Sequence, residues 1–342
     1  MLITHKKSKR ISSRSVPIWF MRQAGRYLPE YHTLRNKEIS FLKTCFNPAV
    51  AAEISLQPII RFDFDFIILF ADILLIPHAL GQNVDFVNGK GPVLGKFELN
   101  GKNSNSDKKA LKILSPIFET IKIIKSKSVQ KKTIGFCGGP FTVLTYMIER
   151  GSSRDHKNTL NFIKNKPNQT KYWLKKITEI SIKYLLKQIE AGADLIKVFD
   201  SWAGLLNERE YEEYIIKPNK EIFESIKNEK KKTKIILFPR KSKHFIDTFL
   251  REINCDIISI DQHLSRKNMD YCRKNKITIQ GNLNPELLFT GGIKMVEEVK
   301  KIMEKYKNNE HIFNLSHGVL PNTPLRNVKQ VVEQVKNYEF TN

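Results

Sequence analysis

Eight short apolar segments recur along this 342-residue chain, and each one stops at a polar or small residue. Between most of them, apolar residues return at helical spacing, which predicts amphipathic helices. Strands that are apolar on both faces are typical of a parallel sheet covered by helices. The segments read PIWF, DFIILFAD, KTIGFC, DLIKVFD, KIILFP, DIISID, ITIQG and IFNLSH.

This alternation favours one large α/β fold. About eight strands in a chain of this length predict a (β/α)8 TIM barrel. No linker or internal repeat divides the sequence, so we expect a single domain over residues 1–342. The clearest helix lies within residues 169–190, where one apolar stripe is formed by Trp173, Ile177, Ile180 and Tyr184.

One connection is too long for a simple crossover between two strands. Residues 82–132 contain two turn pairs, Asn88-Gly89 and Gly91-Pro92. These pairs predict a β-hairpin inserted before the next helix.

Composition narrows the class of protein. The cysteines Cys45, Cys137, Cys255 and Cys272 show no paired spacing, which argues against a disulfide framework or a zinc knuckle. No apolar run reaches the roughly 18 residues of a membrane span, so we expect a soluble, cytoplasmic protein without a membrane partner. The start of the chain is basic, rich in Ser and Arg and free of acids, which leaves an organelle transit peptide open.

The formal net charge of +23 raises the alternative of a basic nucleic-acid-binding protein without catalysis. The lysines lie mostly in runs such as KNEKKKTK, between periodic segments, where solvated loops and helix ends are expected. We find no recognisable binding module and no aromatic residues interleaved with a basic face. We therefore expect no specific nucleic-acid partner.

The polar residues that follow the apolar segments carry the functional signal. Because parallel strands deliver their carboxyl ends to one face of a barrel, these residues are expected to converge in one cleft. Two neighbouring arginines also suit a carboxylate or phosphate ligand, which guanidinium groups bind in a bidentate way. In chain order the residues are Arg22 with Arg26, Asp72, Tyr146 after a Gly-Gly-Pro turn, Ser201, Arg240, Asp261, Asn282 and His317.

Most of these residues also have a structural alternative. Arg22 or Arg26 is equally suited to a structural ion pair. Asp72 is placed to cap the next helix. Tyr146 is consistent with a core position and His317 with an ordinary turn.

Two long motifs identify a family. PIWFMRQAGR, residues 17–26, and GFCGGPFTVLTYMIE, residues 135–149, resemble the first and second signatures of uroporphyrinogen decarboxylase. The similarity continues in the expected order through FADILLIPHALG, VFDSWAG, GNLNP and LSHGVLPNTP, so it spans nearly the whole chain.

The resemblance implies a single barrel with a deep active-site cleft, and a homodimer in which two clefts face each other. It implies stepwise loss of CO2 from the four acetate side chains of uroporphyrinogen III, which gives coproporphyrinogen III in haem biosynthesis. The small-molecule substrate is therefore a tetrapyrrole. The resemblance implies no metal and no organic cofactor.

The resemblance also assigns the site. Asp72 matches the family aspartate that reaches the pyrrole N–H groups, and we expect Asp72 and Arg22 to carry the catalysis. Arg22 is the first candidate for the general acid, directly or by holding a protonated carboxyl or water, although arginine alone is a poor acid. The positions expected to bind substrate are Arg22, Arg26, Arg35, Asp72, Tyr146, Ser201 and His317.

Several positions depart from the family pattern. The segment FPRKSK, residues 238–243, is more basic than the Gly-rich loop expected there. The other departures are His32 for Arg, Arg150 for Gly or Lys, Lys197 for Gln, Gln262 for Trp and Asn284 for Asp. None of them falls on the positions assigned to the chemistry.

Methyltransferases that act on corrinoid proteins are the alternative within the same superfamily. They share the barrel but bind zinc through a His-x-Cys pair and a later Cys. Here the residues two before the four cysteines are Lys43, Gly135, Ile253 and Asp270, so this zinc site is not supported.

Overall fold

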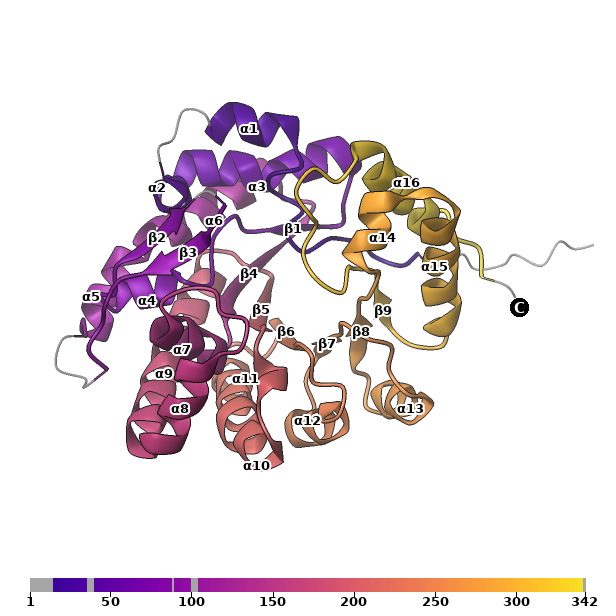
Figure 1. Ribbon diagram of the computed structural model, residues 1–342. Helices are drawn as coiled ribbons and strands as arrows, with labels where there is room; N and C mark the ends of the chain where they lie inside the picture. The colour runs from indigo at the N-terminus through magenta and orange to yellow at the C-terminus, as the bar shows by residue number, and fades with distance from the viewer. Residues whose placement is uncertain (1–14, 36–39, 88, 100–103, 341–342) are drawn as a thin grey trace, which may run out of the picture.

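Seven parallel strands form one curled sheet in the computed structural model, which describes residues 15–35, 40–87, 89–99 and 104–340. The strand order, β1-β4-β5-β6-β7-β8-β9, follows the chain (Figure 1). Residues 1–14, where a transit peptide is left open, lie outside the described part. The strands are β1 (Phe66–Ile68), β4 (Lys132–Gly138), β5 (Leu195–Asp200), β6 (Lys234–Pro239), β7 (Ile257–Ser259), β8 (Thr278–Gln280) and β9 (His311–Ile312).

Each of these strands overlaps a predicted apolar segment, although β4 and β9 each extend one residue beyond theirs. β4, β5 and β6 are the longest, and they are almost wholly buried on both faces. Their register pairs Ile134 with Leu195, and Leu195 with Lys234. The curled sheet confirms the parallel α/β prediction.

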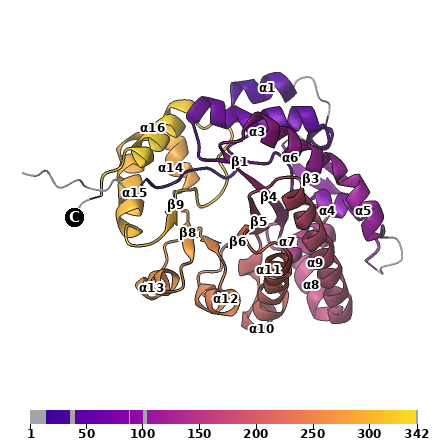
Figure 2. The same cartoon turned by 180° about the vertical axis from the view of Figure 1, so that it is seen from behind.

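Helices cover the outer side of the curled sheet. Figures 1 and 2 show α9, α11, α12 and α13 along the outside of the arc of strands. On the N-terminal side lie α1 (Pro29–Arg35), α2 (Phe41–Cys45), α3 (Pro48–Phe62), α4 (Leu75–Ala79), α5 (Asp107–Ile113) and α6 (Ser115–Lys127). The central helices are α7 (Pro140–Glu149), α8 (Lys157–Asn165), α9 (Pro167–Glu190), α10 (Glu208–Tyr211) and α11 (Lys217–Glu229). The C-terminal helices are α12 (Ile246–Ile253), α13 (Arg266–Lys274), α14 (Pro285–Thr290), α15 (Gly292–Lys305) and α16 (Leu325–Lys336).

The predicted stripe of α9 faces the core. Trp173, Ile177, Ile180 and Tyr184 are each at most 1% exposed. Helix and sheet are also joined by a side-chain amide, because Gln188 accepts from the Phe136 N–H and donates to the Phe136 carbonyl. The helical period therefore predicted the buried face correctly.

The predicted hairpin is present. β2 (Val84–Val87) pairs antiparallel with β3 (Gly91–Leu94), so that Val84 lies opposite Leu94. It lies between α4 and α5 in the chain, outside the curled sheet.

Within the described residues, the first predicted strand forms one bridge, between Ile18 and Phe313. Its other neighbour is Asp65, whose N–H donates to the Ile18 carbonyl at 3.0 Å. The Ile18 N–H donates to the Asp65 carboxylate at 2.7 Å and not to a backbone carbonyl, which interrupts the ladder. The described residues therefore form a curled sheet of seven strands, where a complete barrel of eight strands was expected.

Two expectations from composition can be compared with the fold. The four cysteines are free and buried, in agreement with their unpaired spacing. Among the helices of the described residues, none combines the length and apolar character needed to cross a membrane.

Candidate active site

The turn after the first apolar segment presents Arg22. Two buried amides hold this turn: Asn314 accepts from the Met21 N–H at 3.0 Å, and Gln23 donates to the Phe66 carbonyl at 2.8 Å. Arg22 takes a φ of 59°, a left-handed value that is uncommon outside glycine. Its exposed side chain has no hydrogen bond or ion pair within the described residues, so the guanidinium group is available to a ligand.

Four groups from different strand ends lie within electrostatic reach of Arg22. Burial is the largest influence on the pKa of each, and the positive charge of Arg22 then lowers it. The four groups are Asp72, Tyr146, Arg240 and His317. Such coupling weakens with distance, so the predicted residues Arg22, Asp72, Tyr146 and His317 lie close together.

Asp72 follows β1 and is half-buried. One carboxylate oxygen accepts from the Leu74 N–H at 2.8 Å and supports the turn into α4, which agrees in part with the capping alternative. The other oxygen has no hydrogen bond within the described residues. Burial raises the pKa of Asp72 to about 6, against the lowering effects of the Leu74 N–H and Arg22. Above that pH, the group is a carboxylate with a free acceptor oxygen.

Tyr146 lies on α7, and its ring centroid is 6.1 Å from that of Trp202. Burial raises the pKa of the Tyr146 phenol, Asp72 raises it further, and Arg22 lowers it. The side chain is therefore a neutral hydroxyl at physiological pH and is able to donate a hydrogen bond.

His317 is a neutral imidazole that lies near the charges of Arg22 and Arg240. Burial lowers the pKa of His317 to about 3, and the charges of Arg240, Arg22 and Lys241 act in the same direction. It offers one N–H donor and one acceptor. The positive charge around His317 therefore comes from the neighbouring arginine and lysine side chains.

Arg240 lies within electrostatic reach of Arg22 and Tyr146, and the sequence prediction did not include it among the substrate-binding positions. It comes directly after β6, and its Nε is buried without a hydrogen-bond partner in the described part of the chain. Burial lowers the pKa of Arg240, whereas Asp261 raises it. A buried guanidinium N–H without an acceptor lacks a hydrogen bond, and a ligand carboxylate is a suitable acceptor for it. Two features of the sequence pointed to Arg240: it follows a strand, and it lies in a segment that is more basic than the family pattern.

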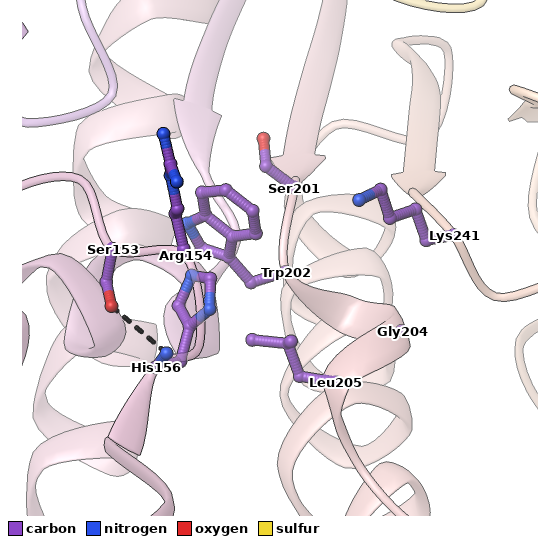
Figure 3. A pocket seen from close by; sticks show the side chains of 8 residues that line it. All are labelled: Ser153, Arg154, His156, Ser201, Trp202, Gly204, Leu205 and Lys241. Carbon is purple, nitrogen blue, oxygen red and sulfur yellow. Dashed lines mark hydrogen bonds between the residues drawn. The ribbon is translucent and has the colours of Figure 1, made fainter. Parts of the chain in front are cut away.

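Ser201 follows β5 and lines a pocket of about 300 Å³ (Figure 3). The Ser201 hydroxyl makes no hydrogen bond within the described residues. The other lining residues are Ser153, Arg154, His156, Trp202, Gly204, Leu205 and Lys241.

A buried carboxylate fixes the position of Ser201. Asp200 accepts from the Thr142 hydroxyl at 2.6 Å and from the Asn219 amide at 3.1 Å. The Trp202 N–H donates to the same Thr142 hydroxyl at 3.1 Å. These bonds join the start of α7 to the end of β5, and thus Tyr146 to Ser201.

Arg26 and Arg35 lie at α1. The exposed Arg26 accepts a hydrogen bond at its carbonyl from His32 Nε2 at 2.7 Å. Arg35 Nη1 donates to the Thr44 hydroxyl at 2.9 Å, on α2. Their part in substrate binding stays a prediction.

Three departures from the family pattern have a clear structural place. His32 is tied to the Arg26 carbonyl. Asn284 caps α14 by accepting from the Glu286 N–H at 2.9 Å, a bond that aspartate also makes. Lys197 is fully buried inside the sheet.

Across the residues that the structure describes, no group of three or more His, Cys, Asp or Glu is arranged to hold a metal ion.

A curled parallel sheet whose strand ends bring arginine, aspartate, tyrosine and histidine together defines an α/β enzyme of the barrel type. Residues 6–338 match the family described as uroporphyrinogen decarboxylase (URO-D), and the chain belongs to this family. It is 44% identical over 332 residues to uroporphyrinogen decarboxylase of Orientia tsutsugamushi (strain Ikeda), covering 94% of each chain. It is 41% identical to that of Rickettsia bellii (strain RML369-C), covering 99% of this chain and all of the relative.

Two solved structures show the same fold at low identity. A methyltransferase from Methanosarcina mazei has a TM-score of 0.75 and 19% identity, covering 94% of this chain and 93% of that one. A putative vitamin-B12 independent methionine synthase from Listeria monocytogenes has a TM-score of 0.58 and 14% identity, covering 94% and 98%. These likenesses concern the fold alone.

Proposed function

We propose that the chain decarboxylates the four acetate side chains of uroporphyrinogen III to methyl groups, giving coproporphyrinogen III in haem biosynthesis. The family membership over residues 6–338 supports this activity. The structural observation that carries it is the pair of Asp72, with one free carboxylate oxygen, and Arg22, with a free guanidinium group, at one end of the sheet.

The chemistry requires an electron sink. Protonation of the pyrrole α-carbon makes the ring cationic, so the C–C bond to the carboxylate breaks and its electron pair moves toward the ring as CO2 leaves. The resulting methylene carbon takes a proton and the α-carbon releases one, so each cycle consumes one proton. An anion beside the pyrrole nitrogens stabilises the cationic intermediate.

Asp72 suits the role of this anion. Its free oxygen accepts pyrrole N–H bonds, which orients the macrocycle and favours positive charge on the ring. Arg22 binds the reacting carboxylate, and we propose that it delivers the proton directly or by holding a protonated carboxyl or water. Tyr146, Ser201 and His317 contact the acidic side chains, with Arg26 and Arg35 at the rim.

We further propose that Pro17–Trp19 completes a single-domain (β/α)8 barrel. Trp19 donates to the Phe313 carbonyl at 3.2 Å, and Phe313 donates to the Pro17 carbonyl at 2.8 Å. On the other side, Asp65 donates to Ile18. Backbone bonds to both neighbours support the place of an eighth strand.

We also propose that the protein is a cytoplasmic homodimer in which two clefts face each other, and that it has no specific nucleic-acid partner. Light scattering of the purified protein tests the dimer.

The function is tested by anaerobic incubation of the protein with chemically reduced uroporphyrin III and a chelator, followed by chromatography of the reoxidised products. The expected products carry seven, six, five and then four carboxylates. Asp72→Ala should abolish them, whereas Asp270→Ala, an exposed change on α13, should not. Unchanged substrate with folded wild-type protein overturns the proposed activity.

A further inference from the structure

The pocket beside Ser201 contains a buried histidine that the proposed chemistry does not use. His156 is 2% exposed, and both ring nitrogens are buried without a hydrogen-bond partner in the described part of the chain. Its backbone N–H donates to the Ser153 hydroxyl at 3.0 Å, which fixes its place before α8 (Figure 3). A buried polar group without a partner is destabilising, so a ligand that supplies the missing hydrogen bond is favoured at this position.

Two cations, Arg154 and Lys241, line the same pocket. The side chains of Arg154 and Lys241 form no hydrogen bond or ion pair within the described residues. The acids beside these residues are already engaged, and Asp261 accepts from the Lys241 backbone N–H at 2.9 Å. Glu149 accepts from Thr159 at 2.7 and 2.9 Å and from Asn158 at 3.0 Å. Asp155 pairs with Lys157 at 3.1 Å. The pocket therefore has an excess of positive charge.

The pocket adjoins Tyr146 of the candidate active site. The Trp202 ring lies 4.4 Å from the His156 ring and 6.1 Å from the Tyr146 ring, so it separates the two side chains. Lys241 also reaches both sites. Burial is the main cause of the lowered pKa of His317 and of His156, and the charge of Lys241 contributes to each. Ser201, at the end of β5, lies on the pocket wall (Figure 3).

We propose that this pocket binds a carboxylate side chain of the tetrapyrrole, with His156, Arg154 and Lys241 as its anchors. This inference rests on the proposed function. A volume of about 300 Å³ lies at the lower end of small-molecule pockets, so it suits one acidic arm and not the macrocycle. The imidazole N–H and the guanidinium group donate to the carboxylate, and the Trp202 ring packs against the carbon chain.

Steady-state kinetics of two variants test the pocket. His156→Phe keeps a ring against Trp202 and removes both nitrogens, while Arg154→Ala removes a surface cation. For each variant we expect kcat/KM for uroporphyrinogen III to fall about 10-fold, chiefly through a higher KM, as for the loss of one charge-assisted bond. The control is His244→Phe, which changes an exposed histidine outside the pocket and should leave KM unchanged.

A second readout does not depend on turnover. Oxidised uroporphyrin III, which carries the same carboxylates, should shift the ring ¹⁵N resonances of His156, assigned through their loss in His156→Phe. If free glutarate shifts them and uroporphyrin does not, the pocket serves a separate acid and our assignment is wrong. If the wild-type protein turns over uroporphyrinogen III and both variants keep its KM, the pocket assignment is wrong and the proposed function stands. If the wild-type protein shows no turnover, the proposed function is wrong.

Discussion

Arg22 lies across Gly318, the residue after His317. A Cβ atom at Gly318 would come within 2.3 Å of Arg22 Cδ and 2.7 Å of its Cγ. The Gly318 backbone is outside the left-handed region, so the missing side chain serves the path of Arg22 and not a turn. Gly318, in the segment after β9, thus shapes the position of Arg22, which follows the first apolar segment.

Gly318→Ala should therefore displace Arg22 without unfolding the protein. We expect kcat/KM to fall about 10- to 100-fold, since small misplacements of positioned groups have such effects. The free energy of unfolding should change by less than about 1 kcal/mol, because the clash is with a flexible side chain. The matched control is Gly25→Ala, whose Cβ would meet only the Arg22 carbonyl at 3.6 Å. Equal kcat/KM in both variants would contradict the positioning role.

Arg22→Lys keeps the charge and removes the planar fork. We expect at least about a 10-fold lower kcat, because an ammonium group does not bind a carboxylate in a bidentate way. Single-turnover kinetics with uroporphyrinogen III measures the chemical step directly. Arg273→Lys, an exposed change on α13, is the control. An unchanged single-turnover rate would remove Arg22 from the chemistry.

The pH profile separates Asp72 from His317. Because burial raises the pKa of Asp72 to about 6, kcat/KM should fall as the pH drops through this value, where protonation removes the acceptor for pyrrole N–H groups. His317, with a pKa lowered to about 3 by burial and neighbouring cations, does not titrate there. His317→Gln should have a lower kcat/KM but the same acid limb. If the acid limb of the kcat/KM profile disappears in His317→Gln, the titrating group is His317 and not Asp72.

Asp200 should make folding stability depend on pH. Burial raises its pKa to about 6, against the lowering effects of Thr142 and Asn219, so the native state holds this proton more tightly than the unfolded chain. Its contribution is therefore fully present at low pH and is lost as the pH rises toward and through 6. Relative to the wild type, Asp200→Asn should gain up to about 3 kcal/mol in free energy of unfolding between pH 4 and 7. Urea unfolding at both pH values measures this, and a constant difference contradicts it.

The strands were predictable because their apolar runs depend on local composition, as in β4 and β5. The first segment forms an isolated bridge for a reason that lies 47 positions away, because the Ile18 N–H donates to the Asp65 carboxylate. Sequence patterns carry no record of such a bond. The same limit applies to the pocket, since the position of His156 against Trp202 depends on the turn before α8.

The candidate site was predictable to the extent that strand ends converge by topology. That rule brought together Arg22, Asp72, Tyr146 and His317. It did not show that Arg240 has a buried Nε without a partner, because burial and hydrogen bonding depend on packing of the folded chain.

Lys197 offers the last prediction, since it places an amine among aromatic rings. Its side chain is fully buried, and Nζ donates to the Ser259 hydroxyl at 3.0 Å. Nζ lies 5.0 Å from the Trp19 ring centroid, 4.8 Å from that of Phe199 and 4.9 Å from that of Phe238. Burial lowers the pKa of Lys197 well below its usual range, so the native state gives up this proton at a lower pH than the unfolded chain does.

Folding then releases a proton, and the stability of the wild type should rise with pH. Lys197→Met should be more stable at pH 7, and its advantage should shrink as the pH rises from 7 to 9, by at most about 1.4 kcal/mol per pH unit. Urea unfolding of both proteins at the two pH values measures the gap. A gap independent of pH would mean that the three rings hold Lys197 as a cation, through cation–π attraction strong enough to offset its burial.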